Sequence, residues 1–338
     1  MTARARTASF AAIAVVVAAG TTGYTIKELH HSQRVRHKEP TVASVPSTAL
    51  PTDDFIAFRH TGLDNEYGVV AVVPLADPEG ARAFTGAVCD RVYATPAGAS
   101  CLSTERGVVT TFKQSQLDTS WQTVSSRPLT GQPSRTRISP DGSLVATTSF
   151  VAGHSYMTVG FSTATEIHSP DGTSYGNIEK FQLVLDGKDV APKDRNIWGV
   201  TFAPDDRTFY ATVGTGGKTY LVKGDLEKRT LTSVVEGVEC PSLSADGSRI
   251  AFKQLGTVDG QKGWTPAVLD LATDERTVLT GETHNVDDQI EWLDDDTILY
   301  GLPRSDEPGV TDVWSLDTTA DAEPQLFIEQ AWSPTVVH

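Results

Sequence analysis

A short turn phrase recurs along this chain, and its spacing constrains the fold more than any other feature. It reads Ser-Pro-Asp-Gly-Ser at 139–143, Ala-Pro-Asp-Asp-Arg at 203–207 and Ser-Ala-Asp-Gly-Ser at 244–248, with a degenerate copy, Trp-Leu-Asp-Asp-Asp, at 292–296. Each copy separates two apolar or alternating stretches, and Asp in such a place typically bonds nearby backbone amides. Taken at Asp205, Asp246 and Asp295, the copies lie 41 and 49 residues apart. We therefore interpret the phrase as a turn inside a repeated β-unit.

The chain from Phe55 onward is typical of an all-β fold. It shows almost no helical periodicity, and short runs of β-branched and aromatic residues alternate with turn residues. These runs occupy 55–58, 68–73, 107–112, 144–150, 180–185, 208–213, 218–222, 249–252, 267–271, 297–300 and 312–316. Four strands in a unit of about 40 residues is the pattern of a β-propeller blade.

Residues 54–338 divide into six such units, so the predicted fold is a six-bladed β-propeller. The expected blades are 54–86, 87–131, 132–190, 191–237, 238–284 and 285–330. Asp141 and Asp205 are 64 residues apart, so we place an insertion at about 160–177. The first blade lacks a strand before Phe55, whereas 331–337 resembles the opening of another blade. We expect 331–337 to be the missing inner strand, which would close the ring and remove an open sheet edge.

The N-terminal residues predict export. Two arginines precede an apolar run over 8–19, which Tyr24 and Ile26 extend. Residues 1–26 are therefore expected to be a signal anchor or, alternatively, a cleaved signal peptide. Residues 27–53 are polar and then rich in Pro, Ser and Thr, which predicts a flexible linker. We expect the propeller outside the cytoplasm, tethered by a single membrane span, or secreted if the signal is cleaved.

The charge of the chain argues against nucleic acid as a partner. Its formal charge is −15, and residues 40–338 alone hold 22 basic against 41 acidic side chains. Binding to a phosphate backbone needs clustered Lys and Arg. The acidic balance favours solubility and neutral or basic partners, and we expect a monomer.

The cysteines predict one disulfide. Cys89 and Cys101 flank a segment that reads as a strand, a Pro-Gly turn and a second strand. Near-opposite residues of such a hairpin have Cα atoms about 4.5–5.5 Å apart, within disulfide reach, and an oxidising compartment would close the bond. The alternative is a pair of unrelated buried thiols. Cys240 is left over and is expected in a buried strand.

The phrases at 139–143 and 244–252, each at the opening of a blade, resemble the TolB-like group of WD-repeat-like six-bladed β-propellers. The resemblance covers roughly residues 54–337, although the first two blades lack the phrase. Together with the N-terminal segment it implies a membrane-anchored bacterial member. That group includes periplasmic scaffold proteins that bind partner proteins and propellers attached to peptidases, so the resemblance implies the fold and leaves the activity open.

No catalytic set stands out. Residues 172–176 match the nucleophile elbow of serine hydrolases, but that chemistry needs a buried strand before the Ser and a helix after it, and we interpret them as a polar loop. Asp294, Asp295 and Asp296 lack the spacing of a calcium loop and are interpreted as a degenerate blade turn. The histidines are isolated or lie in the linker. No metal site and no cofactor are predicted.

Propeller geometry instead points to one face. The innermost strand of each blade lines the central channel, and the segments that lead into these strands open on the same side, here called the mouth face. Aromatic and Arg residues are typical anchors of binding faces. The entering segments supply a mixed-charge ring with two tryptophans: Arg91, Arg135, Arg195, Trp198, Glu239, Asp287, Asp288, Glu329 and Trp332. The alternative is that these charges neutralise one another and only keep the channel hydrated.

The expected function is that of an extracytoplasmic, membrane-tethered propeller that binds an envelope protein or peptide, or acts as a scaffold. Binding is expected through the mouth face or through the segment 153–177. Two alternatives stay open: a propeller enzyme, either a metal-dependent lactonase or a carbohydrate-active hydrolase, and a sensing domain for a small ligand or sugar. A fold of this kind hosts many functions and does not choose among them.

Overall fold

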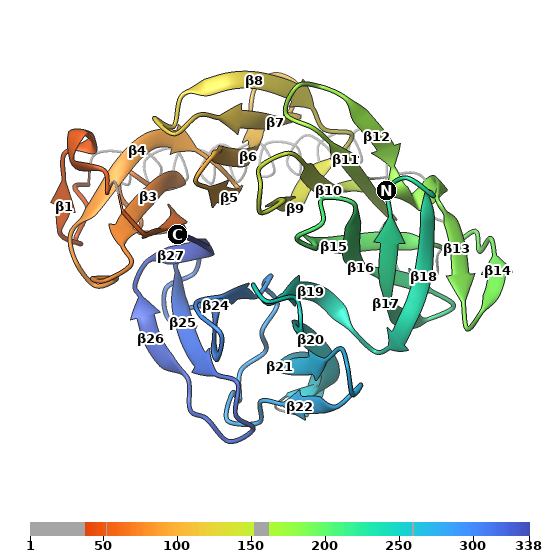
Figure 1. Ribbon diagram of the computed structural model, residues 1–338. Helices are drawn as coiled ribbons and strands as arrows, with labels where there is room; N and C mark the ends of the chain where they lie inside the picture. Colours follow the sequence, from red (N-terminus) through yellow and green to blue (C-terminus); the bar gives the residue numbers. More distant parts are fainter. Residues whose placement is uncertain (1–37, 52, 152–161, 259) are drawn as a thin grey trace, which may run out of the picture.

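The protein is a closed ring of six β-sheets arranged like propeller blades around a common axis (Figure 1). This is a computed structural model, and it describes residues 38–51, 53–151, 162–258 and 260–338. Within each blade, strands that follow one another along the chain pair antiparallel. The prediction of an all-β, six-bladed propeller is confirmed for this part of the chain.

From the axis outward, blade one contains β27 (Ala331–Val337), β2 (Phe55–His60), β3 (Val69–Pro74) and β4 (Arg82–Val88). Blade two contains β5 (Arg91–Thr95), β6 (Gly98–Glu105), β7 (Thr111–Leu117) and β8 (Thr123–Pro128). Blade three contains β9 (Gln132–Ile138), β10 (Val145–Val151), β11 (Ser162–His168) and β12 (Ser174–Asn177).

Blade four contains β15 (Asn196–Phe202), β16 (Thr208–Thr215), β17 (Lys218–Asp225) and β18 (Thr230–Glu236). Blade five contains β19 (Glu239–Leu243), β20 (Arg249–Val258), β21 (Gln261–Asp270) and β22 (Arg276–Val278). Blade six contains β23 (Glu291–Trp292), β24 (Thr297–Pro303), β25 (Thr311–Asp317) and β26 (Gln325–Ile328).

The last strand closes the ring, as the sequence predicted. β27 pairs antiparallel with β2, from Val337 opposite Phe55 to Ala331 opposite His60. Fully buried Ile56 on β2 packs in the same apolar cluster as Ala331. The C-terminal strand and the first strand of the propeller therefore share one sheet, and blade one is complete only when both are present.

Blade four is larger than predicted, because a hairpin expected in blade three is added to its outer edge. β13 (Gln182–Leu185) pairs parallel with β18, and β14 (Lys188–Val190) pairs with β13. The predicted blade 132–190 therefore ends at β12. The predicted insertion at 160–177 is wrong for the described part, because β11 and β12 are ordinary blade strands. Of the segment 153–177, residues 153–161 lie outside the described residues.

The recurring phrase forms the turn between the first two strands of blades three to six. In each copy an Asp Oδ1 accepts a backbone N–H from a residue two or three positions on: Ser143 to Asp141 (2.8 Å), Thr208 to Asp205 (2.7 Å), Ser248 to Asp246 (3.0 Å) and Thr297 to Asp294 (2.8 Å). The last copy is therefore aligned on Asp294, not on Asp295 as predicted. Its interpretation as a degenerate turn is confirmed.

Part of the expected linker lies along blade one. β1 (Ser44–Val45) pairs parallel with β4, and the amide of Arg82 donates to the carbonyl of Ala43 over 3.0 Å. A short 3₁₀ helix, η1 (Ser47–Ala49), follows. The described end of the linker is thus tied to the propeller. The signal anchor or signal peptide expected over 1–26 lies outside the described residues, and within these no helix is long and apolar enough to span a membrane.

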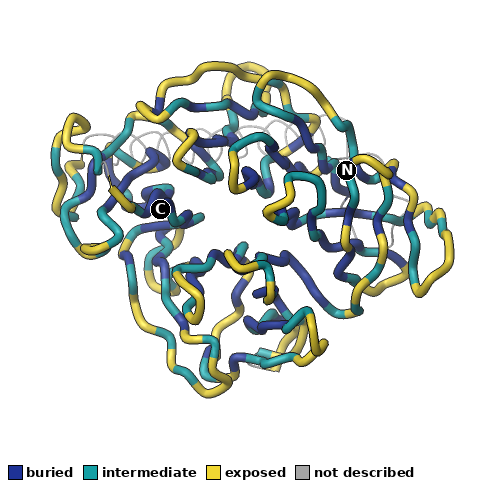
Figure 2. Tube along the Cα trace, viewed as in Figure 1, coloured by how far each residue is buried: buried dark blue, intermediate teal, exposed yellow. Residues whose placement is uncertain are grey.

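The apolar core lies between and within the blades, and exposed residues gather in connections and at outer edges (Figure 2). The cluster between blades three and four contains Leu183, Ile197 and Phe209, all fully buried. Leu183 belongs to the added hairpin, which explains why this hairpin packs there. Full burial of one such side chain contributes about 1.5–3 kcal/mol.

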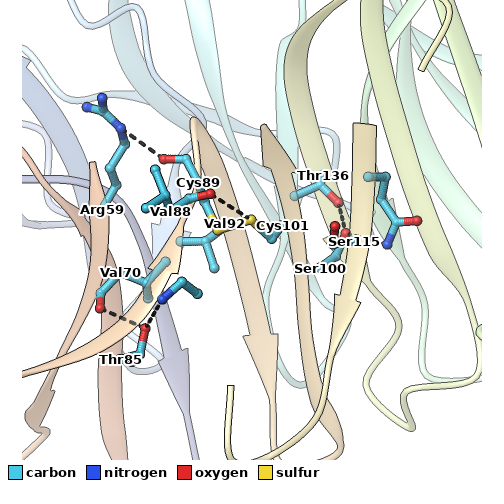
Figure 3. Close-up of a disulfide and its surroundings, with 12 residues drawn as sticks. Arg59, Val70, Thr85, Val88, Cys89, Val92, Ser100, Cys101, Ser115 and Thr136 are labelled. Carbon is cyan, nitrogen blue, oxygen red and sulfur yellow. Dashed lines mark hydrogen bonds between the residues drawn. A yellow bond between two sulfur atoms is a disulfide. The ribbon is translucent and has the colours of Figure 1, made fainter. Parts of the chain in front are cut away.

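The predicted disulfide is confirmed: Cys89 and Cys101 are bonded, with Cα atoms 5.4 Å apart (Figure 3). Cys89 lies just before β5, and Cys101 lies on β6. Arg59 of blade one donates from Nε to the carbonyl of Cys89 over 3.0 Å. The bond thus fixes the chain where it crosses from blade one to blade two. Cys240 is free and buried, as expected.

Candidate binding site at the mouth face

Chain direction assigns each connection to one of two faces. The inner strands β5, β9, β15, β19, β23 and β27 start at the mouth face. The Asp-containing turns follow these strands, so they lie on the opposite side, here called the turn face. The second strand of each blade runs from the turn face to the mouth face. The connections between second and third strands therefore lie on the mouth face. Starts of inner strands and these connections together form the candidate site.

Arg91 and Asp288 form a buried ion pair at the mouth face. Arg91 Nη1 lies 3.0 Å from Asp288 Oδ1, and Asp288 Oδ2 accepts a 3.1 Å hydrogen bond from the amide of Gly301. The guanidinium carbon of Arg91 lies 4.9 Å from the ring centroid of Trp332. Burial, followed by the nearby positive charge of Arg135, lowers the pKa of Arg91 to about 10. These predicted residues are therefore brought together from blades two, six and one.

Arg135, on β9, lies close to this pair and has no carboxylate of its own. Its Nη1 donates to the carbonyl of Ser134 over 2.9 Å. Its Nε is buried and has no hydrogen-bond partner in the described part of the chain. Burial disfavours its charge, but Cys240, Asp288 and Asp287 outweigh it and raise the pKa of Arg135. Arg135 is therefore a fixed positive charge with unused donor capacity.

A second polar group lies on blade five. Lys253 Nζ is 2.5 Å from Asp287 Oδ1 and 4.5 Å from the ring centroid of Trp264. Glu239, at the start of β19, is buried beside them, and burial raises its pKa, with Asp287 acting in the same direction. Predicted Glu239 and Asp287 thus belong to one cluster, which Lys253 and Trp264 complete.

A pocket of about 660 Å³ opens between blades three, four and five. Its aromatic lining is Phe150, Trp198 and Trp264. Its charged lining is Arg135, Lys218, Lys253, Lys262, Glu239 and Asp287. We call this the mouth pocket. It combines aromatic walls with a few charged groups, which is the usual composition of a ligand site.

Arg195 does not join the other predicted residues. Its Nη1 donates to the carbonyl of Phe181 over 3.0 Å. It lines a separate pocket of about 620 Å³ that also contains Glu179 and Lys193. The added hairpin explains the difference, because Phe181 leads into β13 and draws Arg195 outward. Arg195 thus lies beside the mouth-side start of β15 but does not line the mouth pocket, and its role in binding stays a prediction.

Sequence reasoning missed Lys253, Lys262 and Trp264. They lie on β20 and β21, in a region interpreted as a longer loop. Pairing of these two strands continues to Val258 opposite Gln261, which makes the loop a hairpin arm that reaches the mouth face. The available signal was the sequence Gln-Lys-Gly-Trp at 261–264, a turn followed by an aromatic residue in a β-rich context.

A different cluster lies toward the turn face. Arg137 forms an ion pair with Glu291, donates to Ser242 Oγ over 3.1 Å, and has its guanidinium carbon 4.6 Å from the ring of Tyr93. These residues come from blades two, three, five and six, and most are buried. Arg137 is thus engaged on several sides. The cluster joins inner strands of different blades to one another. The guanidinium of Arg137 therefore differs from that of Arg135, whose Nε has no hydrogen-bond partner among the described residues.

Exposed apolar side chains are concentrated on the mouth side. The described chain exposes nine large ones, and six lie at mouth-side strand ends or connections: Tyr67, Val88, Val108, Val109, Phe150 and Leu255. Val108 and Val109 form the tip of the β6–β7 connection. The strand predicted at 107–112 begins only at Thr111, because pairing with β6 ends at Glu105. Exposed apolar groups gathered on one side are typical of interaction surfaces.

Two other candidates behave as structural elements. Ser174 begins the edge strand β12, where its Oγ accepts a 3.0 Å hydrogen bond from the amide of Gly176. β12 pairs with β11, and only a short 3₁₀ helix, η2 (Ile178–Lys180), follows it. Residues 172–176 are therefore a turn into an edge strand rather than a nucleophile elbow. Within the described ranges, no three His, Cys, Asp or Glu side chains are grouped so that they could hold a metal ion.

Comparison with known proteins gives the class of this fold. No family model and no curated protein sequence matches the chain. Among solved structures it is similar to TolB from Acinetobacter baumannii, with a TM-score of 0.60 and 16% identity over 86% of this chain and 69% of that chain. It is also similar to a chain of the nidogen/laminin complex, with a TM-score of 0.56 and 12% identity over 84% and 98%.

The chain is therefore a six-bladed β-propeller. More particularly, its fold is TolB-like, as the turn phrases predicted. At this level of identity the similarity establishes the fold alone. What the protein binds must be argued from the mouth face itself.

Proposed function

We propose that this protein is an extracytoplasmic, membrane-tethered β-propeller that binds a protein or peptide of the cell envelope at its mouth face. The observation that carries the proposal is the asymmetry of the two faces. Each face carries a pocket with aromatic lining, of about 660 Å³ at the mouth face and about 640 Å³ beside the turns, but six of the nine large apolar side chains that the described chain exposes lie on the mouth side. The turn face presents Asp-containing turns closed by their own hydrogen bonds.

The mouth face offers the parts that protein interfaces use. Trp198 and Trp264 supply aromatic surface in a recess, and aromatic and Arg residues dominate the energetics of binding faces. Val108 and Val109 project beyond the recess, at the edge of the same face. A partner that covered the whole mouth face would contact both the mouth pocket and these apolar groups.

The disulfide supports the proposed compartment. Disulfides persist in oxidising compartments and are rare in the cytosol, and Cys89 and Cys101 form one here. The apolar run over 8–19 would supply the membrane tether or the export signal. The part of the linker that precedes β1 would then connect blade one to the membrane.

Capture of partners from envelope extracts tests this function. The double variant Trp198→Ala/Trp264→Ala and the single variant Lys262→Glu change the mouth face, and Lys262 is exposed, so its change spares the core. Val124→Ser/Leu326→Ser removes exposed apolar side chains away from the mouth and is the matched control. Both mouth variants should lose the partner that wild type and control retain.

Melting temperatures equal to wild type would show that the variants fold. Equal capture by every variant would contradict the proposal, as would loss in the control alone. Quantitative mass spectrometry of the captured proteins gives the readout, with the wild-type propeller lacking residues 1–26 as bait.

A further inference from the structure

The mouth pocket is locally basic within an acidic protein. Four cations line it, Arg135, Lys218, Lys253 and Lys262, against two carboxylates, Glu239 and Asp287. The whole chain carries a charge of −15. The excess of cations over carboxylates in the mouth pocket is thus opposite in sign to the charge of the whole protein. A pocket with more cations than carboxylates attracts negatively charged groups.

Only some of these cations are neutralised inside the protein. Lys253 is paired with Asp287 at 2.5 Å, and Lys218 is paired with Glu236 at 2.9 Å. Neither Arg135 nor Lys262 has an ion pair among the described residues. Lys262 is exposed, whereas Arg135 is half-buried, with a buried Nε that has no hydrogen-bond partner among the described residues. A buried charged donor without a partner is costly, so Arg135 is the group most in need of an acceptor.

We propose that the mouth pocket recognises a carboxylate of a peptide segment, with Arg135 as its ionic anchor and an apolar neighbouring side chain between Trp198 and Trp264. This inference rests on the proposed function. Arg binds carboxylates through paired, charge-assisted hydrogen bonds. The aromatic walls give the neighbouring side chain a place to be buried.

The other pocket residues favour a peptide carboxylate over a phosphate. Glu239 and Asp287 lie in the same pocket, and a dianion placed there would be repelled by both. A single carboxylate is repelled less than a dianion. A peptide also brings backbone N–H groups, which can donate hydrogen bonds to Glu239 and Asp287. Arg135 can therefore bind the one negative charge of such a ligand, while Glu239 and Asp287 accept hydrogen bonds from its N–H groups.

The carboxylate can belong to a chain end or to an Asp or Glu side chain, and four labelled peptides distinguish these sources. The first is Gly-Ser-Gly-Ala-Leu-Phe with a free C-terminal acid, and the second is its C-terminal amide. The third is the amide Gly-Ser-Gly-Glu-Leu-Phe, and the fourth has Gln in place of Glu. Fluorescence anisotropy at low ionic strength measures each affinity for the wild-type protein.

One of the two carboxylate peptides should bind at least about tenfold more tightly than its neutral counterpart, which is the scale expected for a charge-assisted contact. Arg135→Gln should abolish that preference. Lys188→Gln removes the same charge from an exposed residue outside the mouth pocket, so it is the matched control and should keep the preference. Arg135→Lys should restore it in part.

The outcomes separate this inference from the proposed function. If all four peptides bind and Trp198→Ala weakens them, but no carboxylate preference exists or the preference survives Arg135→Gln, the carboxylate anchor is wrong and the peptide site stands. If no peptide binds to wild type, the proposed function itself is contradicted. Displacement of a bound peptide by inorganic phosphate would also overturn the assignment.

Discussion

Arg82 donates a hydrogen bond from Nη1 to Nδ1 of His60 over 3.0 Å. A guanidinium only donates, so Nδ1 must be unprotonated, and the ring proton lies on Nε2, which donates to Asp64 Oδ2 over 2.9 Å. Arg82 Nη2 also donates to the carbonyl of Glu329 over 2.9 Å, just before the closing strand β27. A buried, neutral His60 thus supports the junction at which the ring closes.

This junction predicts a pH dependence of stability. Burial lowers the pKa of His60, and Arg82 acts in the same direction, although Asp64 opposes both. In the unfolded protein the His60 imidazole takes up a proton near pH 6.5, whereas in the folded protein it does so only at lower pH. The unfolding free energy should therefore decrease as the pH falls below about 6.5. Urea unfolding between pH 8 and pH 5 should show a smaller decrease in His60→Gln than in wild type.

His168 is an independent comparison. Burial, and then Arg127, lower its pKa from 6.5 to about 4, which corresponds to roughly 3 kcal/mol lost between these pH values. His168→Gln should reduce the pH dependence, and the double variant should reduce it further. If the unfolding free energy of both single variants depends on pH as strongly as that of wild type, the assignment of neutral, buried imidazoles at His60 and His168 is contradicted.

Removal of the closing strand should destabilise the entire propeller. Deletion of residues 331–338 takes away β27 and leaves the edge of β2 unpaired and apolar. We expect loss of cooperative thermal unfolding in circular dichroism and association on size-exclusion chromatography. Deletion of exposed His338 alone is the control and should leave the melting curve unchanged. Normal melting of the longer deletion would refute the closure.

Loss of the disulfide should cost roughly 3 kcal/mol of unfolding free energy, given a loop of this size. The bridged residues are 12 apart in sequence. Denaturant unfolding of Cys89→Ser/Cys101→Ser gives the number. Adding a reductant should lower wild type to the level of the variant and leave the variant unaffected. A reductant effect of equal size in both proteins would point to another cause.

Two glycines in the left-handed region predict different costs on replacement by Ala. Gly199 has φ +66°, and a Cβ there would lie 2.7 Å from the Cα of Cys240. Gly216 has φ +59° and no heavy atom within 4 Å of the same position. Backbone strain alone costs about 1–2 kcal/mol, and overpacking adds about 1–3 kcal/mol at Gly199. If thermal unfolding shows the same loss of stability in Gly199→Ala and Gly216→Ala, the inner strands β15 and β19 move apart readily to accommodate the added methyl group.

The sequence predicts the fold well because the signals for blades are local. An Asp such as Asp246 bonds an amide two residues away, so the turn and its spacing are visible without any tertiary information. The same holds for the fragment at 331–337, which resembles a blade opening, and for Cys89 and Cys101, which lie on one hairpin. These three predictions required only short-range patterns and the need to close a ring.

The failures depend on pairing between distant segments. The β13–β14 hairpin has strand-like residues, but Gln182 of β13 pairs with Thr230 of the parallel strand β18, 48 positions away, and no local pattern predicts that choice. The displacement of Arg195 follows from it. In the mouth pocket, Lys253 and Trp264 face each other only because β20 and β21 pair along their full length. The sequence located the face but not the residues that complete its pocket.

Site-specific photo-crosslinking shows whether a partner contacts the mouth pocket. Benzoylphenylalanine at Lys262 reports contacts at the mouth pocket, and the same group at Val124, 62% exposed on the outer strand of blade two, reports contacts elsewhere. We expect a crosslinked envelope partner from Lys262 and none from Val124, with the Lys262 product reduced in Trp198→Ala/Trp264→Ala. Crosslinks from Val124 with none from Lys262 would contradict it.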